Sequence, residues 1–249
     1  MNNIHTEVIA HRGLSALYPE NTMLAFKEAA KLPIEAIEMD VQLTKDKVPV
    51  IIHDLALDRT TEGQGLVRDH TFQQIRTYSA GAWFSEEYRK ERVPTLEEVL
   101  IWARNYPLKV NLELKGVACD REDLWEKVKM LIDQYKMSTQ VLISSFDHVL
   151  IANILKEGPT IETAIIVTSS MYQPLSYIRS IGTEGFHYYY PMMLNEETKA
   201  LLRAGIQVRP YTINDVEMMK YSYQLGVKGI FTDYPHIALK IREELSNYK

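Results

Sequence analysis

The five residues Ile37–Val41, with the sequence IEMDV, carry two carboxylates two positions apart in an otherwise apolar run. In a β-strand, side chains at positions i and i+2 point to the same face, so Glu38 and Asp40 would lie side by side. Burying two like charges together is costly unless something positive lies between them. The stretch therefore predicts a buried strand whose acidic face requires a cation.

Around this stretch, short apolar runs alternate with longer amphipathic runs. The predicted strands are 7–11, 36–41, 109–114, 141–145, 163–168, 185–190, 207–213 and 229–232. The predicted helices are 22–31, 96–104, 121–136, 148–156, 174–181, 196–204, 216–225 and 237–246. Eight strands alternating with eight helices are typical of an α/β fold of the TIM (β/α)8 barrel type. Because no Gly/Ser/Pro-rich linker divides the chain, we expect residues 1–249 to form a single domain.

One further run, residues 48–53 (VPVIIH), is also strand-like, but only residues 44–47 separate it from the acidic strand. That gap is too short for a crossover helix, so the sequence predicts an antiparallel β-hairpin after strand 2. We expect the chain to turn at Lys45 and Asp46.

The predicted hairpin also determines where the next part of the chain lies. A register in which paired residue numbers add up to 91 would place Glu38 opposite His53 and Asp40 opposite Ile51. Residues 55–94 then form an inserted segment, which we expect over the C-terminal mouth of the barrel. The segment is longer than an ordinary loop, which favours a functional role.

Composition narrows the class of protein. Hydrophobic residues make up 46% and charged residues 24% of the chain, and the formal net charge is −5. This balance argues against nucleic-acid binding, which needs a basic surface. A single cysteine, Cys119, fits a reducing compartment. With neither a signal-peptide pattern nor an apolar run near the roughly 18 residues of a membrane span, we expect a cytoplasmic protein without a stable membrane anchor.

In barrel enzymes the reacting groups lie at the C-terminal ends of the strands. The polar residues predicted at those ends are His11, Arg12, Glu38, Asp40, His53, Asp54, Glu113 and Lys115. Three carboxylates suit a hard divalent cation, Ca²⁺ or Mg²⁺, whereas zinc is less expected because the chain lacks a Cys cluster and an HExxH motif. Two histidines suggest a general acid and a general base, and two basic side chains would attract phosphoryl oxygens. The pattern indicates metal-assisted cleavage of a phosphoester.

Several motifs carry a family resemblance. They are HRG (11–13), PENT (19–22), EMDVQLT (38–44), PVIIHD (49–54), RTTEGQG (59–65), VPTLEEVL (93–100), NLELK (111–115), YTIND (211–215) and GIFTDYP (229–235). Taken in this order, from residue 8 to residue 235, the chain resembles the glycerophosphodiester phosphodiesterases. The resemblance implies a barrel with an insertion after its second strand, and hydrolysis of a glycerophosphodiester to an alcohol and glycerol 3-phosphate.

The resemblance also implies roles for individual residues. It makes His11 and His53 the acid–base pair, Glu38, Asp40 and Glu113 the ligands of Ca²⁺ or Mg²⁺, and Arg12 and Lys115 the phosphate-binding groups. Phe146 and Tyr211 lie near strand ends, and we expect them to line the alcohol site. The family usually has Trp where this chain has Tyr211, and Gly in the hairpin turn where this chain has Lys47.

Some assignments stay open at the level of sequence. Asp54 either orients His53 or begins a turn. Asp233 either caps a turn or binds substrate, with the cap favoured, and His187 is expected to be structural. Two other functions remain: a phosphodiester-binding protein without catalysis, and a phosphodiesterase acting on lysophospholipids through an apolar groove supplied by Trp83 and Phe84. No helix pattern singles out an oligomer interface.

Overall fold

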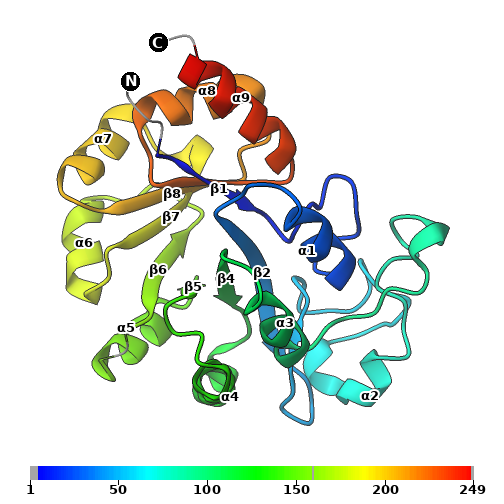
Figure 1. Ribbon diagram of the computed structural model, residues 1–249. Helices are drawn as coiled ribbons and strands as arrows, with labels where there is room; N and C mark the ends of the chain where they lie inside the picture. The colour runs from blue at the N-terminus through cyan, green and yellow to red at the C-terminus, as the bar shows by residue number, and fades with distance from the viewer. Residues whose placement is uncertain (1–4, 159, 248–249) are drawn as a thin grey trace.

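The computed structural model describes residues 5–158 and 160–247, and this part of the chain forms a nearly closed barrel of eight parallel strands (Figure 1). The strands are β1 (Glu7–Ala10), β2 (Ala36–Leu43), β4 (Lys109–Leu114), β5 (Val141–Ser145), β6 (Glu162–Val167), β7 (Gly185–Tyr189), β8 (Gln207–Tyr211) and β9 (Gly229–Thr232). They follow the order β8-β7-β6-β5-β4-β2-β1-β9. Two backbone hydrogen bonds join β8 and its flank to β9, Lys228 N to Val208 O at 2.9 Å and Ile213 N to Phe231 O at 2.8 Å.

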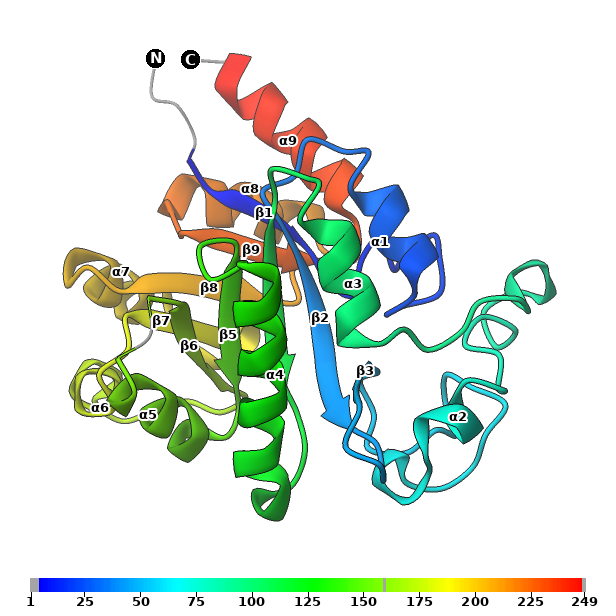
Figure 2. The same cartoon turned by 60° about the horizontal axis from the view of Figure 1, so that its bottom comes forward.

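Helices alternate with these strands and cover the outside of the barrel (Figure 2). They are α1 (Met23–Ala29), α3 (Leu96–Ala103), α4 (Arg121–Tyr135), α5 (His148–Lys156), α6 (Pro174–Ile181), α7 (Asn195–Arg203), α8 (Val216–Leu225) and α9 (Pro235–Asn247). Local sequence explains several of their ends. Thr95 and Glu98 form a capping box at α3, Asp215 caps α8, and Gly226 ends α8 at a φ of +72°. The predicted barrel is confirmed.

All eight residues of β2 are buried, for two different reasons. Ile37, Met39 and Val41 belong to the main apolar core between the barrel and its helices. Glu38 and Asp40 occupy the alternate face, which points into the barrel. A strand that is covered on both faces is buried along its whole length. In β2 the outer face is apolar, and the inner face carries the two carboxylates.

The predicted hairpin is present, with β3 (Pro49–Ile51) antiparallel to β2 and the turn at Lys45 and Asp46. Its register differs from the predicted one, because Val41 pairs with Ile51. The expected pairs Glu38–His53 and Asp40–Ile51 are therefore wrong by one residue. The reason is the longer turn, in which Lys47 adopts a left-handed φ of +61°. His53 instead follows β3 and reaches the barrel mouth from the returning chain.

The inserted segment packs around a small apolar core of its own. This core consists of Val50, Ile52, Leu57, Val67, Ile75, Ala80 and Val93. The inserted segment contains α2 (Phe72–Ile75) and the 3₁₀ turns Val67–Asp69 and Glu86–Tyr88. Figure 2 shows the segment flanking the barrel beside β3. Residues 55–94 are all described, and none of them lines the pocket at the mouth, so the segment flanks the mouth and does not cover it. Its buried apolar side chains pack against Val50 and Ile52 of the hairpin, which keeps the segment beside the barrel.

The opposite end of the barrel is closed by an ionic cluster. Arg209 is fully buried and lies 2.7 Å from Glu162 and 3.4 Å from Glu7.

Further 3₁₀ turns, Ala118–Asp120 and Tyr190–Met192, follow β4 and β7. Within the described residues, the helices are too short or too polar to cross a membrane.

Candidate active site

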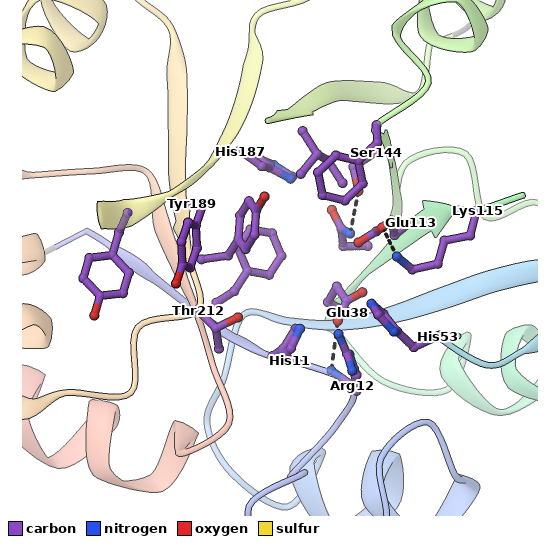
Figure 3. A pocket seen from close by; sticks show the side chains of 16 residues that line it. His11, Arg12, Glu38, His53, Glu113, Lys115, Ser144, His187, Tyr189 and Thr212 are labelled. Atoms are coloured by element: carbon purple, nitrogen blue, oxygen red, sulfur yellow. Dashed lines mark hydrogen bonds and ion pairs between the residues drawn. The ribbon is translucent and has the colours of Figure 1, made fainter. Parts of the chain in front are cut away.

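At the C-terminal ends of the strands the barrel opens into a pocket of about 300 Å³ (Figure 3). Of the nine site residues predicted from the sequence, every one except Asp40 lines this pocket. Asp40 is fully buried next to it, in contact with Arg12 and Lys115. The structure thus brings the whole predicted set together, with contributions from strands far apart in the chain.

The three predicted metal ligands converge on one point. Glu38, Asp40 and Glu113 each offer a carboxylate oxygen, and these oxygens lie within 4.8 Å of one another. Asp40 and Glu113 are register partners on β2 and β4, and Glu38 lies two residues before Asp40 on the same face. Burial, together with the charges of Asp40 and Glu113, raises the pKa of Glu38 well above its usual value. The cluster therefore holds more negative charge than its surroundings neutralise.

Three carboxylate oxygens of this cluster also lack hydrogen bonds. Among residues 5–158 and 160–247, Glu38 Oε1, Asp40 Oδ1 and Glu113 Oε1 are buried and have no hydrogen-bond partner, although Lys115 forms ion pairs with the last two. Buried acceptors normally have a partner, so these oxygens suit a positively charged ligand. An all-oxygen, acidic donor set is the one that Ca²⁺ and Mg²⁺ prefer. The residues present therefore fit a hard divalent cation.

Arg12 and Lys115 supply the positive charge that the protein itself brings. The Arg12 backbone N–H donates to Glu38 Oε2 at 2.9 Å, and its Nε lies 3.3 Å from Asp40 Oδ2. Lys115 Nζ lies 2.5 Å from Glu113 Oε1 and 3.5 Å from Asp40 Oδ1. Burial opposes ionisation of Asp40, but Arg12 and Lys115 bring its pKa below the ordinary value. Both cations also face the pocket, so they remain available to an anionic ligand.

His11 directly follows β1 and is fixed by a carboxylate from the other end of the chain. Its Nδ1 lies 2.6 Å from Asp233 Oδ1, which also accepts a hydrogen bond from Ser15 Oγ at 3.0 Å. Asn214 Nδ2 donates to the second oxygen of Asp233 at 2.6 Å. The favoured expectation for Asp233, a turn cap, does not account for these contacts, through which its carboxylate orients His11. The two residues are 222 positions apart, and only the closing of the barrel brings them together.

His53 is held in the same way by its neighbour in sequence. Its Nδ1 lies 2.6 Å from Asp54 Oδ1, which resolves the open assignment of Asp54 in favour of orienting the imidazole. Burial lowers the pKa of His53, and the charges of Arg12 and Lys115 lower it further against the opposing effect of Asp40. Since both imidazoles engage a carboxylate through Nδ1, both leave Nε2 for the pocket.

Arg59 of the RTTEGQG motif connects the inserted segment to this site, which the sequence analysis did not anticipate. Its guanidinium contacts both oxygens of Asp54, at 2.7 and 2.9 Å, and both oxygens of Glu20, at 2.9 and 2.8 Å. Glu20 in turn accepts a hydrogen bond from Arg12 at 2.8 Å. One arginine therefore links the carboxylate behind His53 to the carboxylate behind Arg12. Glu20 lies in the PENT motif, which was the only sequence signal for it.

The outer wall of the pocket is aromatic. Phe146 and Tyr211 meet edge to face with ring centroids 6.4 Å apart, and Tyr189 lies 6.1 Å from Tyr211. The Tyr211 hydroxyl donates to the backbone of Val167 at 2.8 Å, which fixes the ring. Both predicted aromatic residues thus line the pocket, and the more exposed Phe146 lies toward solvent.

The inner floor of the pocket contains residues that the sequence analysis left without a role. Asn111, Ser144, His187 and Phe231 line it, and all four are buried. His187 was expected to be structural, and its position in the pocket could be found only from the fold. Strand alternation alone would have placed Asn111 on the inner face, two residues before Glu113.

Fold and site together define a (β/α)8-barrel protein whose mouth holds a cluster of three carboxylates and two histidines that each contact a carboxylate. Comparison with known proteins agrees with this class. A model of the glycerophosphoryl diester phosphodiesterase family matches residues 11–237. A glycerophosphodiester phosphodiesterase from Bacillus altitudinis is 40% identical over 246 residues, covering 96% of this chain and 99% of that protein. Another from Caldanaerobacter subterraneus subsp. tengcongensis is 35% identical, covering 95% of this chain and 97% of that protein.

Solved structures show the same relationship. The structure of an Oleispira antarctica phosphodiesterase in complex with the product sn-glycerol-3-phosphate superimposes with a TM-score of 0.91 at 29% identity. The match covers 95% of this chain and 96% of that one. The chain belongs to the glycerophosphoryl diester phosphodiesterase family.

Proposed function

We propose that this protein hydrolyses glycerophosphodiesters to an alcohol and sn-glycerol 3-phosphate, assisted by a divalent cation and two histidines. The observation that carries the proposal is the convergence of three carboxylates, two buried and one partly buried, in a pocket lined by two imidazoles that each engage a carboxylate through Nδ1. The Oleispira relative holds sn-glycerol-3-phosphate as its product, which supports the same product here.

The cation, Ca²⁺ or Mg²⁺, would be held by Glu38, Asp40 and Glu113. When bound, it supplies positive charge that offsets the negative charge developing on the phosphoryl oxygens. Arg12 and Lys115 flank the same point and would bind the remaining phosphoryl oxygens, the former through a planar fork and the latter as a point charge. These groups orient the phosphorus between His11 and His53.

The two histidines would move the protons at Nε2. One accepts the proton of the attacking hydroxyl as its oxygen bonds to phosphorus, and the other donates a proton to the departing oxygen as the second P–O bond breaks. Asp54 and Asp233 keep Nδ1 protonated, because an ionised carboxylate can only accept a hydrogen bond.

Two routes are compatible with this geometry. In the first, the 2-hydroxyl of the glycerol arm attacks, which gives a cyclic phosphate that water then opens with the histidine roles reversed. In the second, water attacks the diester directly. Trapping a cyclic phosphate in a single turnover favours the first route, whereas incorporation of one labelled solvent oxygen without a cyclic species favours the second.

The proposed activity is tested by comparing hydrolysis of glycerophosphocholine and lysophosphatidylcholine, before and after chelation and after restoring Ca²⁺ or Mg²⁺. We expect cation-dependent release of glycerol 3-phosphate from the first substrate. His11→Ala and His53→Ala should each lower turnover at least about 10²-fold. His70→Ala, in the inserted segment, is the matched control and should retain activity.

Absence of turnover of either substrate with added Ca²⁺ or Mg²⁺ would leave a binding protein in place of an enzyme. Preference for lysophosphatidylcholine would instead indicate the lipid-directed alternative. Trp83 and Phe84, which were expected to supply an apolar groove, are partly exposed in the described structure and lie outside the pocket lining, so the water-soluble substrate is favoured.

A further inference from the structure

The inner face of β2 carries one more polar side chain, Gln42, which the proposed reaction does not use. Glu38, Asp40 and Gln42 occupy alternate positions of this strand, so all three point to the same face. Gln42 is 4% exposed and lies outside the pocket lining. A buried primary amide needs partners for its two N–H groups, and those partners indicate its role.

The amide nitrogen of Gln42 meets three consecutive backbone carbonyls. Its Nε2 lies 2.8 Å from Ile52 O, 3.0 Å from His53 O and 2.7 Å from Asp54 O. An amide has two N–H donors, so the three oxygens share two hydrogens. They belong to the stretch where the returning chain leaves β3, just after the hydrogen bond from Ile52 N to Asp40 O at 2.9 Å. Gln42 therefore curls this stretch around a single point.

This curl carries the imidazole of His53 together with its carboxylate partner. His53 is the middle one of the three residues, and Asp54, whose Oδ1 lies 2.6 Å from His53 Nδ1, comes next. Figure 3 shows His53 beside Glu38 and below Lys115, where it lines the pocket. Because the rotamers open to a side chain depend on its own backbone, the Gln42 amide determines how His53 enters the site.

The three carbonyls need a donor between them to keep this arrangement. Carbonyl oxygens carry partial negative charge, so three of them directed at one point repel one another unless N–H groups separate them. A side chain of similar size without a donor, such as methionine, would leave these oxygens unpaired. The stretch would then turn toward water or other donors, and His53 would move with it.

We propose that Gln42 is a positioning residue that acts through His53. It holds the backbone of residues 52–54, while Arg59 holds the Asp54 carboxylate. The inner face of β2 thus supplies both the expected cation ligands and the support of one imidazole, and a single rigid strand fixes the spacing between them. The inference rests on the proposed function for the reaction that His53 serves.

Kinetics of Gln42→Met test this positioning in the intact protein. We expect kcat for glycerophosphocholine to fall about 10- to 100-fold with KM within about twofold, because Arg12 and Lys115 still bind the phosphate while the imidazole is misplaced. Gln140→Met is the matched control, since Gln140 Nε2 also donates to a backbone carbonyl, that of Tyr106 at 3.0 Å, but precedes β5 at the opposite end of the barrel. A kcat equal to that of the control, or a loss that appears only in KM, would overturn the proposal.

A double-mutant cycle separates positioning from a general effect on the fold. In the His53→Ala background, Gln42→Met should change kcat by less than about twofold, because no imidazole remains to be positioned. If the two losses instead multiply, Gln42 acts independently of His53 and the assignment is refuted.

The imidazole nitrogen signals in NMR spectra give a readout that does not need hydrolysis. The signals of His53 are identified by their loss in His53→Ala. We expect Gln42→Met to shift the His53 Nδ1 signal, because the contact with Asp54 changes, and to leave the His11 signals in place. Unshifted His53 signals would contradict the positioning. If the methionine variant does not fold, the same shift is expected in Gln42→Asn, whose amide stays polar but is one methylene shorter.

The outcomes distinguish this inference from the proposed activity. Shifted His53 signals in a protein that hydrolyses no glycerophosphodiester would keep the positioning of the imidazole and remove the catalytic proposal. Hydrolysis by the wild type with an unchanged kcat in Gln42→Met would keep the catalytic proposal and remove the positioning role.

Discussion

At the scale of single residues, Asp54 and Asp233 have the same relation to the two imidazoles. Each accepts from Nδ1 across 2.6 Å, although one is the next residue in the chain and the other is 222 positions away. Burial opposes ionisation of Asp233, but the hydrogen bond and charge of His11 bring its pKa below the ordinary value. The carboxylate therefore stays ionised across the neutral range and fixes one tautomer of its histidine.

Replacing either carboxylate tests this positioning. In Asp54→Asn and Asp233→Asn the amide can donate to Nδ1, which shifts the proton to Nε2 and removes the base. We expect kcat to fall by about 10- to 100-fold with little change in KM, measured as full pH–rate profiles. Asp215→Asn changes the same residue type at a helix cap and should not alter the profile. Unchanged kcat in both site variants would show that the carboxylates do not set the tautomer.

Glu38 shows a conflict between stability and function. Its pKa is raised by burial and by Asp40 and Glu113, so the folded protein without a cation binds a proton there more tightly than the unfolded chain does. The associated stability is present at low pH and is lost as pH rises from the unfolded value of about 4.3 through the raised folded value. At neutral pH and without a cation, ionised Glu38 destabilises the fold.

Glu38→Gln is therefore expected to stabilise the cation-free protein while weakening cation binding. The amide oxygen still accepts from the Arg12 backbone N–H, but the like charge is gone. In the presence of a chelator at pH 8, we expect the variant to melt about 2–4 °C higher than the wild type. For a chain of this size, that shift corresponds to about 1 kcal/mol in the free energy of unfolding. Thermal melts across pH provide the check, and the gain should shrink toward pH 4. A lower melting temperature in chelator would contradict the repulsion inferred for this cluster.

At the scale of elements, Arg59 connects the inserted segment to the site. Within the described residues 5–158 and 160–247, it is the residue of this segment whose side chain bonds to Glu20 and Asp54. The guanidinium binds both carboxylates with two contacts each, a geometry that lysine cannot reproduce. Burial opposes ionisation of Glu20, but Arg59 and Arg12 bring its pKa below the ordinary value. The segment thereby braces the loops that carry His53 and Arg12.

Arg59→Lys should loosen that brace without unfolding the segment, whose apolar core is elsewhere. We expect kcat/KM to fall by about tenfold, from misplacement of His53 and Arg12 together. Arg89→Lys is the matched control, because Arg89 bridges Glu62 and Glu86 within the same segment and lies away from the pocket. Equal kcat/KM for the two variants would mean that Arg59 only stabilises the surface.

The elements also show what a sequence can and cannot predict. Period-two alternation placed Glu38 and Asp40 on one face of β2, and the barrel rule brought Glu113 to them, because both are properties of regular strands. The hairpin register was missed by one residue, since it depends on the left-handed conformation of Lys47. Asp233 and His187 were missed as site residues because the residues they contact, His11 and Phe231, are distant in the sequence and come from other strands of the closed barrel.

At the scale of the whole molecule, the barrel has charges buried at both ends, with opposite consequences. At the bottom, Arg209 forms ion pairs with Glu162 and Glu7, so its charge is offset by the protein itself, although its Nη1 has no hydrogen-bond partner within residues 5–158 and 160–247. At the mouth, three carboxylates face the two cations Arg12 and Lys115, and the balance is left to a ligand. The ion pairs at the closed end are made within the protein. At the open end, we expect the free energy of unfolding to depend on whether a cation is bound to the carboxylates.

Cation binding should therefore be visible in the stability of the entire barrel. A ligand that binds only the folded state at a concentration 100 times its Kd stabilises by about 2.7 kcal/mol. For a chain of this length that corresponds to a rise in melting temperature of roughly 5–11 °C. We expect this rise with Ca²⁺ or Mg²⁺ after chelation, growing with pH because protons compete for Glu38. Glu113→Ala should reduce the rise in melting temperature, whereas the control Glu62→Ala in the inserted segment should preserve it. A melting temperature that neither cation changes at pH 8 would exclude these carboxylates as a cation site.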